Sequence, residues 1–155
     1  INMAPKSLLR HPKCVSPKSD FHKGKRFQEL IDDPNTVAAK NVKRVLLCSG
    51  KIYYDLLEKK ESEQIKEVAI VRIEQLYPLP GYQLDKIKRK YSGAEFFWVQ
   101  EEPENMGANR FIRYRMQKWN LTSISRETSA SPSTGYKKIH DEQQTILISK
   151  AFGDL

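Results

Sequence analysis

Residues 42–57 have the sequence VKRVLLCSGKIYYDLL, in which an apolar run is followed by a turn and a second apolar pattern. Its first half, Val42–Cys48, is a short apolar run that ends at a turn, which predicts a buried strand. Its second half carries apolar residues at helical spacing after Ser49, a residue type that favours helix N-caps. The stretch therefore predicts a buried strand that leads directly into an amphipathic helix with Ser49 as its N-cap.

The same unit recurs along the rest of the chain. Further strands are predicted at residues 67–73, 95–100 and 121–125, and further helices at residues 84–91, 108–119 and 139–151. Regular alternation of strands and helices predicts an α/β domain with a parallel sheet covered by helices on both faces. Ligands of such sheets favour the carboxyl ends of the strands, which here carry residues 49–51, 74–80, 100–107 and 126–134.

The first 24 residues differ in composition from the rest. They contain Pro5, Pro12 and Pro17 among many Ser and Lys residues, which predicts an extended arm that lies against a neighbouring structure. The predicted organisation is an arm at residues 1–24 followed by an α/β domain at residues 25–155. A weak strand is expected at Phe27–Ile31.

Composition excludes several classes of protein. The 155 residues contain no apolar run near the ~20 residues that a membrane-spanning helix needs. The two cysteines and three histidines lack the spacing of a zinc site. The net charge of +8 permits a nucleic-acid or anionic partner, but Lys and Arg alternate with Glu and Asp, as on solvated helix faces.

Two positions offer cations to an anionic ligand. Lys51 follows the predicted strand-to-helix turn, where backbone N–H groups favour an anion, although an ordinary capped turn explains the same residues. Lys6, Ser7 and Arg10 place two cations and a hydroxyl within the arm, where the alternative is a solvated linker. No phosphate-loop or dinucleotide glycine pattern accompanies them.

The polar loops do not predict catalysis. Glu101 and Glu102 are adjacent and would point to opposite faces of a strand, so they form a poor acid–base pair. The small-residue loop Ser129–Thr134 lacks a nucleophile elbow, and helix capping explains its serines. No catalytic or metal-binding residue is therefore predicted in this chain.

Five blocks of sequence resemble, in order, the carboxy-terminal domain of the E1 component of 2-oxoglutarate dehydrogenase. They are MAPKSLLRHP at residues 3–12, VLLCSGKIYYDLL at residues 45–57, VAIVRIEQLYP at residues 68–78, WVQEEPENMGA at residues 98–108 and SASPSTGYKK at residues 129–138. The resemblance covers essentially the whole chain, and it extends to the related 2-oxoadipate dehydrogenase.

The resemblance implies a transketolase C-terminal-like fold. That fold is a three-layer α/β/α sandwich on a five-stranded, mostly parallel sheet, in which residues 27–31 would supply the antiparallel strand. It implies a parent enzyme that decarboxylates 2-oxoglutarate in the tricarboxylic acid cycle with thiamine diphosphate and Mg²⁺, both bound by upstream domains. The acyl product passes to the lipoyl group of E2, the dihydrolipoyl succinyltransferase.

For this domain the resemblance implies support, contacts within an E1 homodimer, and regulation, without catalysis by the isolated domain. Relatives bind AMP or acetyl-CoA near its junction with the preceding domain, and Lys6, Ser7, Arg10, Lys51 and Arg72 are the candidate residues here. The expected compartment is the bacterial cytoplasm or the mitochondrial matrix. The competing hypotheses are a free-standing nucleotide- or CoA-binding module and a basic nucleic-acid-binding domain.

Overall fold

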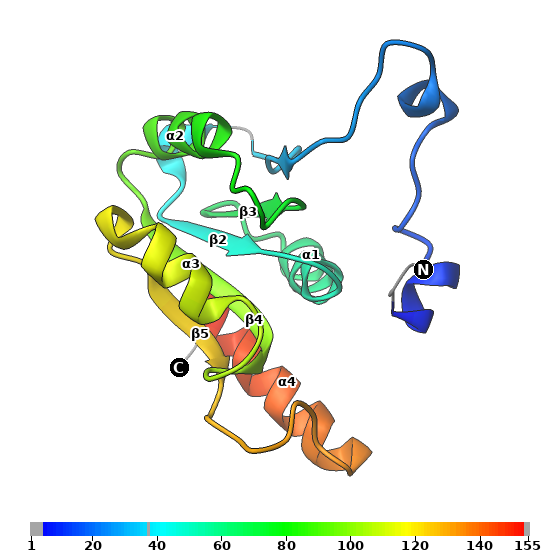
Figure 1. Ribbon diagram of the computed structural model, residues 1–155, viewed down its shortest axis with the longest axis vertical. Coiled ribbons are helices and arrows are strands. Elements are labelled where there is room, and N and C mark those ends of the chain that lie inside the picture. The colour runs from blue at the N-terminus through cyan, green and yellow to red at the C-terminus, as the bar shows by residue number, and fades with distance from the viewer. Residues whose placement is uncertain (1–4, 37, 154–155) are drawn as a thin grey trace.

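A computed structural model describes residues 5–36 and 38–153, so Met3 and Ala4 of the first resembling block lie outside the described residues. Its centre is a five-stranded sheet with the order β1-β3-β2-β4-β5 (Figure 1). All neighbouring strands are parallel except β1, which pairs antiparallel with β3. The strands are β1 (Leu30–Ile31), β2 (Arg44–Cys48), β3 (Val68–Ile73), β4 (Glu95–Pro103) and β5 (Thr122–Arg126). This sheet confirms the predicted fold class.

Helices cover both faces of the sheet and complete three layers (Figure 1). Because successive residues of a strand point to opposite faces, Val45 and Leu47 pack with α2 and α3, whereas Leu46 and Cys48 pack with α1 and α4. The helices are α1 (Ile52–Ser62), α2 (Gly81–Lys90), α3 (Asn109–Arg115) and α4 (Lys137–Phe152), with 3₁₀ turns η1 (Lys6–Arg10), η2 (Lys18–Phe21), η3 (Ala39–Asn41) and η4 (Gln117–Trp119).

The prediction that Ser49 caps the first helix is wrong. Helix α1 begins at Ile52, and the residue before it is Lys51, whose side chain makes no capping hydrogen bond. Gly50 has a φ of +75°, a conformation that glycine adopts without strain, and its carbonyl accepts a hydrogen bond from the Tyr53 amide. Gly50 therefore makes the turn, and α1 begins beyond Ser49, at Ile52. Helix α4 likewise has no side-chain cap, so the loop at Ser129–Thr134 does not cap it as expected.

Two predicted boundaries also shift. The helix expected over residues 108–119 ends at Arg115, and the chain tightens into η4, which sets Trp119 edge-on to Phe96 with ring centroids 5.1 Å apart. Strand β4 continues to Pro103, three residues beyond the predicted end, because its last residues still pair with β5. Apolar spacing predicts where both elements lie. Strand β4 ends where its pairing with β5 ends, and the helix ends where Trp119 packs against Phe96.

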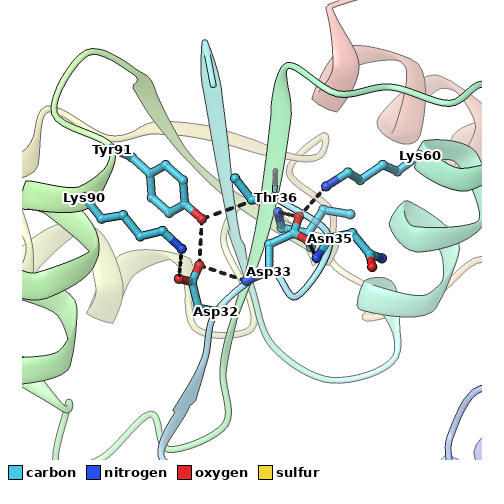
Figure 2. A network of polar contacts seen from close by, with 8 residues as sticks. Asp32, Asp33, Asn35, Thr36, Lys60, Lys90 and Tyr91 are labelled. Carbon is cyan, nitrogen blue, oxygen red and sulfur yellow. Dashed lines mark hydrogen bonds and ion pairs between the residues drawn. The ribbon is translucent and has the colours of Figure 1, made fainter. Parts of the chain in front are cut away.

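At the β1 edge, a turn at residues 32–35 joins the two helical layers (Figure 2). Asp33 is 7% exposed, and its Oδ2 accepts hydrogen bonds from the Ile70 amide at 2.8 Å and from Nζ of Lys60, a residue of α1. Asp32 points to the other face, where it accepts from the Tyr91 hydroxyl at 2.8 Å and pairs with Lys90 of α2. Strand β1 has only two residues, so it pairs with a short part of β3. Beyond it, the Asp33 carboxylate serves as the acceptor for the Ile70 amide of β3.

The amino-terminal arm extends away from the sheet (Figure 1). Its described residues are mostly exposed, and they include Phe21, which is 80% exposed. Contacts with α1 occur at Lys13, which pairs with Glu61, and at His11, whose ring lies 4.7 Å from that of Tyr54. The division into an arm at residues 1–24 and a domain at residues 25–155 stays a prediction.

Candidate functional site

Lys51 lies at the carboxyl edge of the sheet, but acidic side chains already compensate its charge. Its Nζ lies 2.7 Å from a carboxylate oxygen of Glu101 and 3.8 Å from one of Asp55. Its side chain is partly buried. An incoming anion would have to displace these two carboxylates, so Lys51 is the least available of the predicted cations.

Arg72 lies on β3 and is held by aromatic and acidic neighbours. Its guanidinium lies over the ring of Tyr53, 4.3 Å from the centroid, a cation–π contact. Its Nε is 3.5 Å from a carboxylate oxygen of Glu74, forms no hydrogen bond and is buried. Arg72 therefore keeps hydrogen-bonding capacity that the described residues do not use.

Tyr54, next to this arginine, connects it to the arm. Burial and a hydrogen bond with Cys14 raise the pKa of Tyr54 to about 12, and the positive charge of Arg72 opposes that rise. Burial likewise raises the pKa of Tyr53, again against the effect of Arg72. Tyr54, whose phenol stays protonated at neutral pH, therefore contacts His11 and Cys14 of the arm on one side and Arg72 on the other.

Lys6, Ser7 and Arg10 lie on η1 of the arm and are exposed. Within the described ranges, their side chains form no ion pair or hydrogen bond, so their polar groups face solvent. The structure thus brings the arm and Arg72 to one side of α1, through His11, Cys14 and Tyr54. Lys51 turns instead toward Glu101 and Asp55. In the part of the chain that the structure describes, no hydrogen bond or ion pair joins Lys6, Ser7 or Arg10 to Arg72 or to Lys51, so the predicted residues do not form one pocket.

Sequence reasoning missed the aromatic residues that join the arm to the domain. The apolar spacing predicts only a helix position for Tyr53 and no role for Tyr54, and His11 is predicted only as part of the arm. A usable signal was present, because the first turn of a helix that follows β2 lies beside the end of the neighbouring strand β3, where Arg72 stands.

Two cavities lie at the carboxyl ends of the strands, as parallel sheets favour. One, of about 600 Å³, is lined by Ser49 and Gly50, by Leu76 and Tyr77, and by Trp98, Gln100, Glu102, Gly107, Ala108 and Phe111. The other, of about 670 Å³, lies between α4 and the loop that follows β5, and Arg126 lines it. Neither cavity includes Lys6, Ser7, Arg10, Lys51 or Arg72.

The segment at residues 100–107, which contains the end of β4 and the loop that follows it, has a structural role. Gln100 is 3% exposed, accepts a hydrogen bond from the indole N–H of Trp98, and donates to the carbonyl of Met106 at 2.8 Å. Glu101 serves as the partner of Lys51. This segment is therefore held in place by amide and ion-pair contacts.

A family model described as 2-oxoglutarate dehydrogenase C-terminal matches residues 15–152. The chain belongs to this family. Among its relatives, the 2-oxoglutarate dehydrogenase E1 component of Cupriavidus necator is 42% identical in an alignment that covers 99% of this chain and 17% of that protein. The oxoglutarate dehydrogenase of Buchnera aphidicola is 44% identical over 97% of the chain, and the mitochondrial 2-oxoglutarate dehydrogenase of Caenorhabditis elegans is 42% identical over the same share. The chain spans about 17% of the length of these relatives.

Solved structures support the fold of this 2-oxoglutarate dehydrogenase C-terminal domain. A split-gene transketolase, solved as an inactive β4 tetramer, matches with a TM-score of 0.59 and 13% identity over 90% of this chain and 46% of that one. No helix in the described part of the chain is long and apolar enough to cross a membrane. Across residues 5–36 and 38–153, no group of three His, Cys, Asp or Glu side chains is placed to hold a metal ion.

Proposed function

We propose that this chain supports and regulates the E1 component of a 2-oxoglutarate dehydrogenase as its C-terminal domain. One observation carries the proposal: identity of 42–44% over at least 97% of the chain to proteins of that name, of which it spans only 17%. The match to these relatives over almost the whole chain, together with the sheet architecture, supports a domain of a longer polypeptide. Its helices cover both faces of the sheet, and its arm reaches outward, where a preceding domain would lie.

The parent enzyme would decarboxylate 2-oxoglutarate and pass the succinyl group to the lipoyl group of E2. Thiamine diphosphate supplies the carbanion-stabilising chemistry of that step. The cofactor and its Mg²⁺ would be bound by upstream domains, and the E1 homodimer would be assembled around them.

The substrate is tested with the complete polypeptide that contains this chain. Supplied with thiamine diphosphate, Mg²⁺ and oxidised lipoyl groups of E2 as the acyl acceptor, it should release CO₂ from 2-oxoglutarate faster than from 2-oxoadipate at equal concentrations. A higher rate with 2-oxoadipate would assign the chain to the related enzyme, and no release from either 2-oxo acid would contradict the proposed activity.

The regulatory part of the proposal concerns an anionic effector, AMP or acetyl-CoA. Lys6, Ser7 and Arg10 offer exposed polar groups without partners among the described residues. Arg72 lies over Tyr53, and the neighbouring Tyr54 contacts His11 of the same arm. Guanidinium groups suit phosphate oxygens, because their N–H groups form a planar fork. Lys51 would join the site only after release from Glu101, so it is expected to contribute least.

The effector site is tested by titrating the complete polypeptide with acetyl-CoA. Arg10→Ala should weaken binding by about tenfold, in line with the loss of one charged contact. The matched control is Arg113→Ala, since Arg113 is exposed, lies on α3 on the other face of the sheet, and should leave binding unchanged. Equal affinities for wild type and Arg10→Ala would remove Arg10 from the site.

A further inference from the structure

The larger cavity of about 670 Å³ lies away from the residues proposed for the effector. Its walls are one side of α4 and the loop between β5 and α4. Its volume lies within the range of small-molecule sites, about 300–1,000 Å³. Arg126, the last residue of β5, lies at its inner end.

Arg126 is a buried cation with no acidic partner. It is 9% exposed, and its Nη2 donates to Oε1 of Gln144 at 2.8 Å and to Nδ1 of His140 at 3.2 Å. The Gln144 amide is uncharged. Because arginine can only donate, Nδ1 of His140 must accept this hydrogen bond and carries no proton. Across the described ranges no carboxylate lies within ion-pair distance of Arg126. Burial of a charge is costly unless an opposite charge or hydrogen bonds compensate it.

Two further donors at this cavity are unused. The Nε of Arg126 and the Oγ1 of Thr134 are buried and have no hydrogen-bond partner in the described chain. The Nη1 of Arg126 makes no hydrogen bond to the described residues and is not among these fully buried atoms, so it is free to donate to a ligand. The nearby start of α4 has neither a side-chain cap nor an acidic residue in its first turn. All of these groups favour an anion.

Apolar side chains form the wall that continues along α4. Ile139, Ile146 and Leu147 line the cavity, and the two isoleucines are 43% and 49% exposed. Their spacing places them on one side of the helix, and Pro132 faces them from the loop. Glu127 also lines the cavity, but it is exposed to water. The cavity therefore combines a cationic inner end with an aliphatic wall.

We propose that this cavity binds a small carboxylate with an aliphatic body. The carboxylate accepts a hydrogen bond from Nη1 of Arg126, and the aliphatic body covers Ile139 and Ile146. The ligand supplies the negative charge that the described residues around Arg126 lack. This site is separate from the effector site, because none of the proposed effector residues lines it.

Titration calorimetry on the complete polypeptide tests the proposal with hexanoate, hexanol and inorganic phosphate. Hexanoate should bind saturably, and hexanol and phosphate at least about tenfold more weakly, because each lacks one half of the match. Arg126→Gln and Ile146→Glu should each weaken hexanoate binding at least about tenfold, a loss of about 1.4 kcal/mol. Arg113→Gln is the control for lost surface charge, and Arg10→Ala separates this site from the effector site; both should bind hexanoate like wild type.

The proposal is overturned by no saturable hexanoate binding, by wild-type affinity in both Arg126→Gln and Ile146→Glu, or by phosphate binding as tight as hexanoate binding. Ile146 is half-exposed, so its variant tests the cavity even where Arg126→Gln loosens the end of β5. A loss of hexanoate binding in Arg10→Ala would also contradict it, since the carboxylate would then occupy the arm.

Discussion

The two edges of the sheet carry buried charges in opposite conditions. At the β1 edge, the Asp33 carboxylate accepts hydrogen bonds from Lys60 and from the amides of Asn35 and Ile70 (Figure 2). At the β5 edge, Arg126 has only neutral partners and unused donors. A buried charge with all its partners holds elements together, whereas one that lacks them is a candidate for binding a ligand. The stability of the domain should therefore depend on the first edge and its binding of anions on the second.

Removal of the Asp33 carboxylate should have the largest effect on stability. Asp33→Ala leaves Lys60 as a buried cation and the Ile70 amide without an acceptor, so the free energy of unfolding should fall by about 4–5 kcal/mol. Urea unfolding measures this change. Lys60→Met is the matched variant; it should cost about half as much, because Asp33 then keeps both amide donors. Equal losses would mean that the ion pair alone, and not the carboxylate as an acceptor, holds this edge.

The centre of the sheet provides a neutral contrast to both edges. Burial raises the pKa of the Cys48 thiol from 9.0 to about 12, with Arg72 opposing and Glu74 adding to the shift. The folded state therefore prefers the protonated thiol, so its contribution to stability is complete below pH 9 and is lost as pH rises toward 12. Wild type should lose up to about 1.4 kcal/mol per pH unit more than Cys48→Ala over that range.

Urea unfolding at several pH values measures this difference. The control is Val99→Ala, because Val99 is fully buried, pairs with Cys48 across β2 and β4, and does not ionise. It should lower stability yet keep the wild-type slope. A Cys48→Ala slope equal to that of wild type would contradict the assigned cause.

The outer half of the β1-edge turn should matter much less than its buried half. Lys90 and Asp32 form an ion pair whose side chains are 41% and 31% exposed, so water screens their attraction. Lys90→Met should therefore lower the free energy of unfolding by less than about 1 kcal/mol, and the effect should shrink in 0.5 M NaCl, a concentration chosen for screening. A loss as large as that of Asp33→Ala would show that exposure does not separate the two carboxylates.

The smallest effect on unfolding is expected at the β5 edge. Arg126→Gln removes a buried charge that has no acidic partner, so the lost hydrogen bonds are offset, and the change should stay within about 1 kcal/mol. Hexanoate should raise the melting temperature of wild type and leave that of the variant unchanged, since only a ligand of the folded state stabilises it. Strong destabilisation with no response of wild type to hexanoate would make Arg126 a structural residue like Asp33.

The sequence predicts the parts of this fold that local patterns determine. The apolar runs at residues 45–48 and 68–71 identify strands because they are buried on both faces. The short strand at Leu30–Ile31 was only weakly indicated, because it exists through pairing with β3. The predicted cap at Ser49 failed because Gly50 makes the turn without it. Each error lies where a long-range contact or a backbone conformation overrides local preference.

The candidate sites were less predictable for the same reason. Asp33 and Lys60, and Arg126 and Gln144, are distant in sequence and meet only through the fold. Lys51 has the predicted position, yet its partner Glu101 comes from another strand and compensates its charge. Chemistry at single positions could be proposed from the sequence, but the state of each charge depends on neighbours that only the structure brings together.

One measurement tests the central claim, that this chain acts as a domain of a 2-oxoglutarate dehydrogenase E1 polypeptide. A cell extract is fractionated by size, assayed for CO₂ release from 2-oxoglutarate, and blotted on a denaturing gel with an antibody against residues 5–153. We expect a band several times larger than the 18.0 kDa of this chain, in the fractions that hold the activity. A band at 18.0 kDa in fractions without the activity would contradict the claim.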